Sequence, residues 1–243
     1  MIHLLLVTAD KKKVLYITNR MKFNEFEQPD FGEYSSRKIV LSKDGKPARF
    51  QIPRLYMPFG ISGFTPDVGP KKWNIDFSLK GFDEDGGYIQ KFYRFLVDLE
   101  SSVVDHVHQN SEEIFGSPMS REKIESMFNS NIKQSVGREP KLRVKVDVDA
   151  SGFIKPKIFD ANEADVTSEA EEKLHSRQTG AAIVELNSIY FMNRRFGVTW
   201  KLHQLKVFEP QRLKGFQFVS EPGEDESSSS NSTRLTGFQF ISE

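Results

Sequence analysis

Basic side chains interleaved with aromatic rings make residues 181–208 the stretch with the clearest chemical meaning. The candidate residues in it are Tyr190, Phe191, Arg194, Arg195, Lys201 and His203. Cations bind the phosphates of a single-stranded nucleic acid, and flat rings stack on its bases. The composition therefore predicts a binding surface for a single strand, which needs no catalytic group.

A β-hairpin is the element that has to position these side chains. Residues 183–191 and 196–208 are rich in β-branched and aromatic residues, and a short polar turn separates them. Alternate residues of a strand share a face, so Trp200 belongs to the core side and Lys201 to the opposite side. The hairpin therefore has one buried face and one face that carries charge.

The second strand of this hairpin changes phase near its end. Leu205 and Val207 are apolar at positions where the first half of the strand is polar, and this predicts a β-bulge. We expect Arg194, Arg195 and Lys201 to lie together on the open face.

Further binding candidates lie outside the hairpin. The segment 53–70 contains four prolines and three glycines and is interpreted as an irregular loop that could clamp a strand. The candidates in this loop and in the strands predicted after it are Arg54, Tyr56, Phe59, Lys71, Lys72, Trp73, Arg143 and Lys145. Trp73 is shared between a core strand and the lysine pair beside it, so both roles stay open for it.

The composition gives little support to an enzyme. Cysteine is absent, which excludes disulfides, cysteine zinc sites and thiol nucleophiles. His106 and His108 are two apart on a predicted helix, so they face different sides and make a poor metal pair. No phosphate-binding glycine loop, nucleophile elbow or zinc-protease motif is present. We expect no catalytic residue, no cofactor and no metal.

Charge and termini add weaker indications. The 243 residues contain 34 basic and 34 acidic side chains, but six of the acids and only three of the bases lie in residues 209–243. A weakly basic body with an acidic tail suits nucleic-acid binding. The apolar run at residues 4–7 is too short for a membrane span and lacks the features of a signal peptide, so we expect an intracellular protein without a membrane partner.

The remaining patterns predict a mainly β, α+β domain. Short strands are expected at 36–41 and 48–52 around an Asp-Gly turn, at 73–79, and in a hairpin of 142–148 with 153–159. Helical periodicity begins at Tyr88, and Ser117 or Ser120 can cap a second helix. An OB-fold-like antiparallel barrel over residues 21–208, with a helical insertion at about 88–135, accounts for this order. Residues 1–20 form either an extension ahead of a natural start at Met21 or a small strand pair.

The C-terminal segment 209–243 is expected to be a flexible tail that repeats a short motif. Residues 212–221 and 234–243 are identical at eight of ten positions, and a serine-rich acidic linker separates them. We interpret the repeat as a docking motif presented twice, which raises its local concentration. Its partner-binding rings would be Phe216, Phe218, Phe238 and Phe240. The alternative is a strand and its copy pairing with an exposed sheet edge.

The pattern at residues 197–207, GVTWKLHQLKV, together with the tail, resembles single-stranded DNA-binding proteins of large nucleocytoplasmic DNA viruses. Phage single-stranded DNA-binding proteins are similar in outline. The resemblance implies an OB-fold that holds DNA on its sheet face during replication, recombination or repair, and a tail that recruits replication proteins. It also implies a viral replication site in the host cytoplasm or nucleus, and leaves RNA binding and homo-oligomers open. The tail departs from that pattern because it is only mildly acidic and ends in Ser242-Glu243 instead of a ring.

A second class of function stays open beside DNA binding. A β-barrel interaction protein or virion component could use the duplicated tail motif for docking, with its basic residues incidental.

Overall fold

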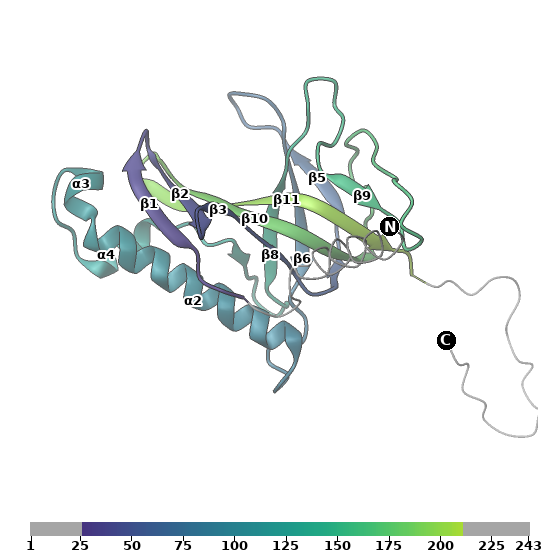
Figure 1. The fold of residues 1–243 in the computed structure, drawn as a ribbon, viewed down its shortest axis with the longest axis horizontal. Coiled ribbons are helices and arrows are strands. Elements are labelled where there is room, and N and C mark those ends of the chain that lie inside the picture. Colours follow the sequence, from purple (N-terminus) through teal and green to yellow (C-terminus); the bar gives the residue numbers. More distant parts are fainter. Residues whose placement is uncertain (1–25, 211–243) are drawn as a thin grey trace, which may run out of the picture.

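The computed structural model describes residues 26–210 of the chain (Figure 1). The expected extension at 1–20 and the duplicated motif with its four phenylalanines lie outside the described residues. Within residues 26–210, no helix is both long and apolar enough to cross a membrane.

Eleven strands and three helices make up the described part of the chain. The strands are β1 (Asp30–Ser35), β2 (Lys38–Lys43), β3 (Lys46–Gln51), β4 (Leu55–Met57), β5 (Ile61–Phe64), β6 (Lys72–Ser78), β7 (Ile132–Lys133), β8 (Lys141–Val146), β9 (Lys157–Phe159), β10 (Gln178–Met192) and β11 (Arg195–Phe208). The helices are α2 (Tyr88–Gln109), α3 (Ser111–Phe115) and α4 (Arg121–Met127).

Five strand segments close into a barrel. Strands β4 and β5 act as one strand bent at Gly60, because β4 pairs with β10 and β5 pairs with β6. The circuit continues from β6 to β8, from β8 to β11 in parallel, and from β11 back to β10. A five-stranded barrel of this kind is the arrangement of an OB-fold. The expected mainly β fold with a helical insertion is therefore confirmed.

Two expectations for local structure are wrong. The segment 53–70 is not only an irregular loop, since it contains β4 and β5; its prolines fall outside these strands, where a missing amide donor is tolerated. Strand β9 does not form a hairpin with β8 but runs parallel to β11, with Gln204 opposite Lys157. A single bridge between Val148 and Ile154 is all that remains of that hairpin in the described residues.

The β10–β11 hairpin is longer than the barrel. Its barrel half pairs with β3 and β4, and its far half pairs with β2 (Figure 1). The register shifts where Ile183 pairs with Gln204 but Val184 pairs with Leu202, which leaves His203 as the extra residue of a bulge. The predicted phase change before Leu205 is therefore confirmed.

Helix α2 covers the inner face of this sheet. Its Phe95 ring meets Phe50 of β3 edge to face, and Phe50 meets Trp200 of β11 in the same way. Trp200 is 3% exposed, so its assignment to the core is confirmed. Figure 1 shows α2 along one side of the sheet, while the loops beside β5 and β9 project on the other side.

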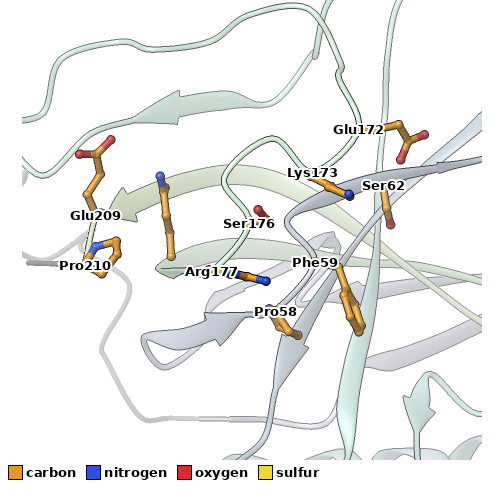
Figure 2. A pocket seen from close by; sticks show the side chains of 10 residues that line it. Pro58, Phe59, Ser62, Glu172, Lys173, Ser176, Arg177, Glu209 and Pro210 are labelled. Atoms are coloured by element: carbon orange, nitrogen blue, oxygen red, sulfur yellow. The ribbon is translucent and has the colours of Figure 1, made fainter. Parts of the chain in front are cut away.

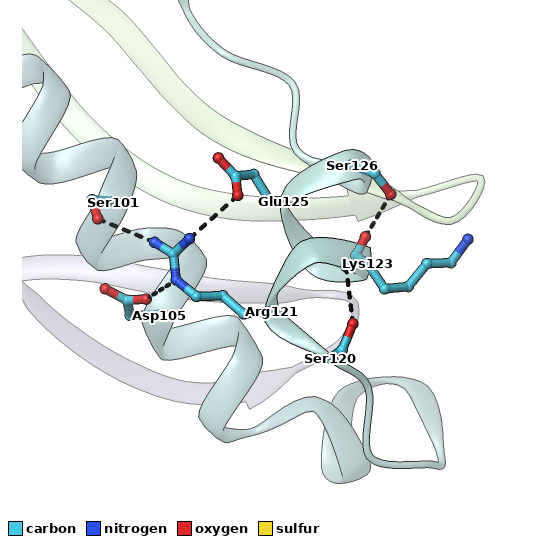
Figure 3. A network of polar contacts seen from close by, with 7 residues as sticks. All are labelled: Ser101, Asp105, Ser120, Arg121, Lys123, Glu125 and Ser126. Carbon is cyan, nitrogen blue, oxygen red and sulfur yellow. Dashed lines mark hydrogen bonds and ion pairs between the residues drawn. The ribbon is translucent and has the colours of Figure 1, made fainter.

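Helix α4 is anchored on α2 by a polar network (Figure 3). Of the two predicted caps, Ser117 and Ser120, the structure shows Ser120, whose hydroxyl accepts a hydrogen bond from the Lys123 amide at 3.3 Å. Arg121 donates from Nε to Asp105 of α2 at 2.8 Å and from Nη1 to Glu125 at 3.3 Å. This network fixes the helical insertion on the side of the barrel that carries α2.

Candidate nucleic-acid interface

Outward-facing polar residues form one continuous row across six strands. Directly paired residues share a face of the sheet, so the strand register defines the row. We call it the transverse row; it runs Ser62 (β5), Asn74 (β6), Lys145 (β8), Lys201 (β11), Glu185 (β10) and Arg49 (β3). Val144 and Val146, which flank Lys145 along β8, point inward and are buried. Alternation in six separate strands therefore builds one polar surface.

Acidic side chains hold the cations of the transverse row in place. Asp147 contacts Lys145 Nζ at 2.6 Å and Lys201 Nζ at 3.7 Å. Burial raises the pKa of Asp147, but the two lysines outweigh this and hold the pKa below its ordinary value. At the other end, Glu185 accepts a hydrogen bond from Arg49 Nε at 2.6 Å. The lysines are therefore ordered but already have a carboxylate neighbour.

A second basic group lies beside the row. Arg143 of β8 donates from Nε and Nη2 to the two carboxylate oxygens of Asp76 at 2.8 and 2.9 Å. Asp76 is 4% exposed, whereas the Arg143 side chain remains well exposed to solvent. Lys141 also lies near Asp76, with its Nζ 4.6 Å from the centre of the Phe59 ring. An exposed cation and an exposed ring thus flank the row.

A shallow hollow continues this face beyond Lys201. Its volume is about 420 Å³, and Phe159, Ala181 and Lys206 are among the residues that line it. The Lys206 ammonium contacts Glu163 at 3.1 Å. An aromatic ring, a cation and an uncovered floor thus lie together at the far end of the face.

The structure groups three of the predicted residues and separates others. Arg143, Lys145 and Lys201 lie on neighbouring strands, and His203 lies at the bulge two residues beyond Lys201. Arg194 and Arg195 do not join them. They lie at the hairpin turn, six residues or about 20 Å along the strand from Lys201. The expectation of one cluster is wrong because the hairpin extends past the barrel.

Two predicted rings are engaged elsewhere. Phe191 is 9% exposed and packs against Phe196 with ring centres 5.7 Å apart, so its faces are not open to a base. Tyr190 is half-buried, and its hydroxyl accepts a long hydrogen bond of 3.5 Å from Asn129. The site prediction for Phe191 therefore fails on burial.

The predicted residues of the 53–73 segment lie around the mouth of the barrel. The Arg54 guanidinium lies 3.8 Å from the centre of the Phe208 ring and donates to Thr179 at 2.7 Å. Tyr56 and Phe59 are 43% and 44% exposed. The Lys71 ammonium lies 4.2 Å from the centre of the Trp73 ring and contacts Glu172 at 2.8 Å. Lys72 is exposed at the start of β6.

Sequence reasoning missed several residues of this face. Asn74, Arg49 and Lys141 alternate with buried residues in predicted strands or directly before one, so alternation could have identified them. Asp147 and Glu185 carry no such signal, because acidic groups are not expected on a phosphate-binding surface. Among the described residues no group of three or more His, Asp or Glu side chains could hold a metal ion.

Comparisons with solved structures find similar chains at low sequence identity. One similar solved structure is the single-stranded DNA-binding protein from bacteriophage Enc34 in complex with ssDNA; it has 9% identity, a TM-score of 0.41, and coverage of 78% of this chain and 99% of that chain. Another is gp2.5, a single-stranded DNA-binding protein encoded by bacteriophage T7, with 13% identity, a TM-score of 0.44, and coverage of 74% and 100%. No curated protein matches the sequence.

One protein family accounts for more than half of the chain. The model of a family of unknown function (DUF5871) matches residues 90–219, which include α2 from its third residue, α3, α4 and the whole β10–β11 hairpin. The chain belongs to this family of unknown function.

Proposed function

We propose that this protein binds single-stranded DNA on the outer face of its barrel, without catalysis and with little sequence preference. The observation that supports it is the placement of Arg143, Lys145 and Lys201 on adjacent strands of one face. That face lies opposite the side packed against α2. Cations there would bind phosphates, and the exposed Phe59 ring would stack on a base. Neither the phosphate contacts nor the stacking distinguishes one base from another, so little sequence preference is expected.

A single strand fits this face better than a duplex. Stacking on Phe59 or Phe159 requires a base whose flat face is free, and a duplex hides these faces in its own stack. Asn74 and Ser62 add short polar groups between the rings and the cations. The phage proteins with similar backbones are single-stranded DNA-binding proteins by name, and the proposal gives this chain the same class of ligand.

A titration of labelled oligo(dT) by fluorescence anisotropy at two salt concentrations tests the proposal. The double variant Lys145→Gln/Lys201→Gln should bind more weakly, with a salt slope smaller by about 0.7 for each lost phosphate contact. The matched control is Arg94→Gln/Lys123→Gln, which removes two exposed cations from α2 and α4. Equal binding by wild type and the Lys145/Lys201 variant would contradict the proposal, as would equal affinity for a duplex of the same length.

The wider role follows from the resemblance noted in the sequence. We extend the proposal to a viral replication or recombination apparatus inside the host cell, with Phe238 and Phe240 of the tail docking a replication protein. A pull-down with the tail peptide tests this part separately. Loss of the recovered protein is expected when the rings of both copies of the motif, Phe216, Phe218, Phe238 and Phe240, are replaced with serine.

One observation favours the second candidate, an interaction or virion protein. Arg49, Arg143, Lys145 and Lys201 all contact a carboxylate within the described residues, which is also how a purely structural surface is built. This candidate requires that no oligonucleotide binds at low salt while the tail peptide still recovers a protein.

A further inference from the structure

A large open cavity lies at the mouth of the barrel, beside the transverse row. Its volume is about 1340 Å³, and it lies between the β4–β5 bend and the loop 171–178 (Figure 2). Phe59 and Ser62 line one side, and Lys173, Ser176 and Arg177 of the loop line another. Ser62 is also the first residue of the transverse row, so the cavity and the row form one continuous surface.

The loop that carries the two cations is held tightly against the bend. The Ile61 amide donates to Leu174 O at 2.8 Å, the Lys173 amide to Ile61 O at 2.9 Å, and the Arg177 amide to Met57 O at 2.8 Å. At Gly60 an added Cβ would lie only 2.2 Å from the Leu174 carbonyl oxygen, so only glycine permits this approach. The positions of Lys173 and Arg177 are therefore set before any ligand binds.

Both cations have an unfavourable backbone conformation. Lys173 and Arg177 have φ values of 65° and 59°, in the left-handed region that non-glycine residues rarely adopt. Such conformations persist where the surrounding structure enforces them, and they are concentrated at functional sites.

The cations of the cavity differ from those of the transverse row in having no ion-pair partner. Within the described residues no ion pair or side-chain hydrogen bond engages Lys173 or Arg177. Glu172 contacts Lys71 at 2.8 Å and accepts from the Gly63 amide at 3.1 Å, so it is occupied. Glu209 lies across the cavity from Phe59 (Figure 2). Lys71 lowers the pKa of the Glu172 carboxyl and the neighbouring Lys173 helps to lower it, but that carboxyl forms its ion pair with Lys71. The side of the cavity next to Phe59 therefore presents two cations that form no ion pair within the described residues.

We propose that this cavity binds one nucleotide of a strand as it leaves the transverse row, with the phosphate on Lys173 and Arg177 and the base against Phe59. The inference rests on the proposed function, because the strand that enters the cavity is the one bound along the transverse row. Lys141, between Asp76 and the Phe59 ring, marks the passage from one to the other. Ser62 and Ser176 supply hydroxyls for the sugar or the base edge.

A length series of oligo(dT) separates the cavity from the row. Lengths from about 4 to about 16 nucleotides cover the site sizes of single OB-folds. The variant Lys173→Gln/Arg177→Gln should bind, with the same affinity as wild type, the shortest oligonucleotide that wild type still binds. It should lose affinity at the lengths that reach the cavity by at least about 5-fold, because a base that is no longer held through its phosphate also loses its stacking on Phe59. The salt slope at those lengths should fall by about 0.7, because one phosphate contact is lost.

A second variant tests the ring. Phe59→Leu keeps an apolar side chain and the charge of the cavity, so it should weaken binding of long oligonucleotides without changing the salt slope. The control variant Arg94→Gln/Lys123→Gln should follow wild type at every length, and thermal unfolding should show that all variants are folded.

The outcomes distinguish this inference from the proposed function. If wild type binds no oligonucleotide, both fail. If Lys145→Gln/Lys201→Gln weakens binding while Lys173→Gln/Arg177→Gln matches wild type at every length, the cavity assignment alone fails. Equal losses at all lengths would also overturn it, because the cavity would then not be a separate position on the path.

Discussion

Removing one carboxylate should strengthen DNA binding if the transverse row is the interface. Asp147 is the shared partner of Lys145 and Lys201, at 2.6 and 3.7 Å. A phosphate on these lysines would take a position close to Asp147 and be repelled by it. The substitution Asp147→Asn keeps the shape of the side chain and removes its charge.

The size of the gain follows from Coulomb's law. For a phosphate about 6 Å from the Asp147 carboxylate, the repulsion is about 0.7 kcal/mol at a dielectric constant of about 80 and about 2.8 kcal/mol at about 20. These values correspond to gains in affinity of about 3-fold and about 100-fold. Because all three side chains are partly exposed, salt screening places the expected gain near the lower value. The unpaired lysines should cost at most about 1 kcal/mol of folding stability.

Anisotropy titrations of Asp147→Asn and wild type with oligo(dT) provide the measurement. The matched control is Asp105→Asn, which removes one carboxylate paired with Arg121 at 2.8 Å in the helical network of Figure 3. Both variants change the net charge equally, so a gain confined to Asp147→Asn would come from the face itself. Unchanged or weaker binding by Asp147→Asn, or an equal gain in both variants, would refute the assignment of the row.

Three further results are expected. Gly60→Ala should lower the free energy of unfolding by more than about 2 kcal/mol in urea titrations, because left-handed backbone strain of about 1–2 kcal/mol adds to the close contact of the new Cβ. The control is Gly45→Ala, where an added Cβ has no atom within 4 Å, so this variant should show the backbone strain alone. Burial lowers the pKa of His175 below its ordinary value of 6.5, so the folded protein favours the neutral ring. The free energy of unfolding should therefore decrease as the pH drops below 6.5, because the unfolded chain binds the proton more readily. The variant His175→Gln should show a smaller decrease, and an unchanged decrease would contradict this reasoning. In a Trp73→Phe variant, oligo(dT) should leave the emission of buried Trp200 unchanged, and quenching would contradict its place in the core.

Local patterns predicted the parts of the fold that depend on neighbouring residues. The hairpin, the bulge before Leu205, the burial of Trp200 and the Ser120 cap follow from alternation, phase and capping preference, which act within a few residues. Their agreement with the structure reflects short-range physics.

Features that depend on distant pairing were not predictable in this way. The bend at Gly60 joins β4 and β5 into one barrel strand although prolines surround them, and only the pairing partners β10 and β6 define it. The separation of Arg194 and Arg195 from Lys201 is an exception, because six residues of extended strand, a spacing present in the sequence, already place them about 20 Å apart. The cations of the cavity lie in a polar loop whose docking requires contacts with the distant bend.

The closing seam of the barrel has a consequence for the order in which the chain folds. Leu55 pairs with Gly180, two positions separated by more than half of the chain. Ring closure must therefore wait for β10 during synthesis, and until then β4 presents an unpaired edge. Such distant pairing slows folding, so newly made chains depend on rapid arrival of the β10–β11 hairpin to avoid association through that edge.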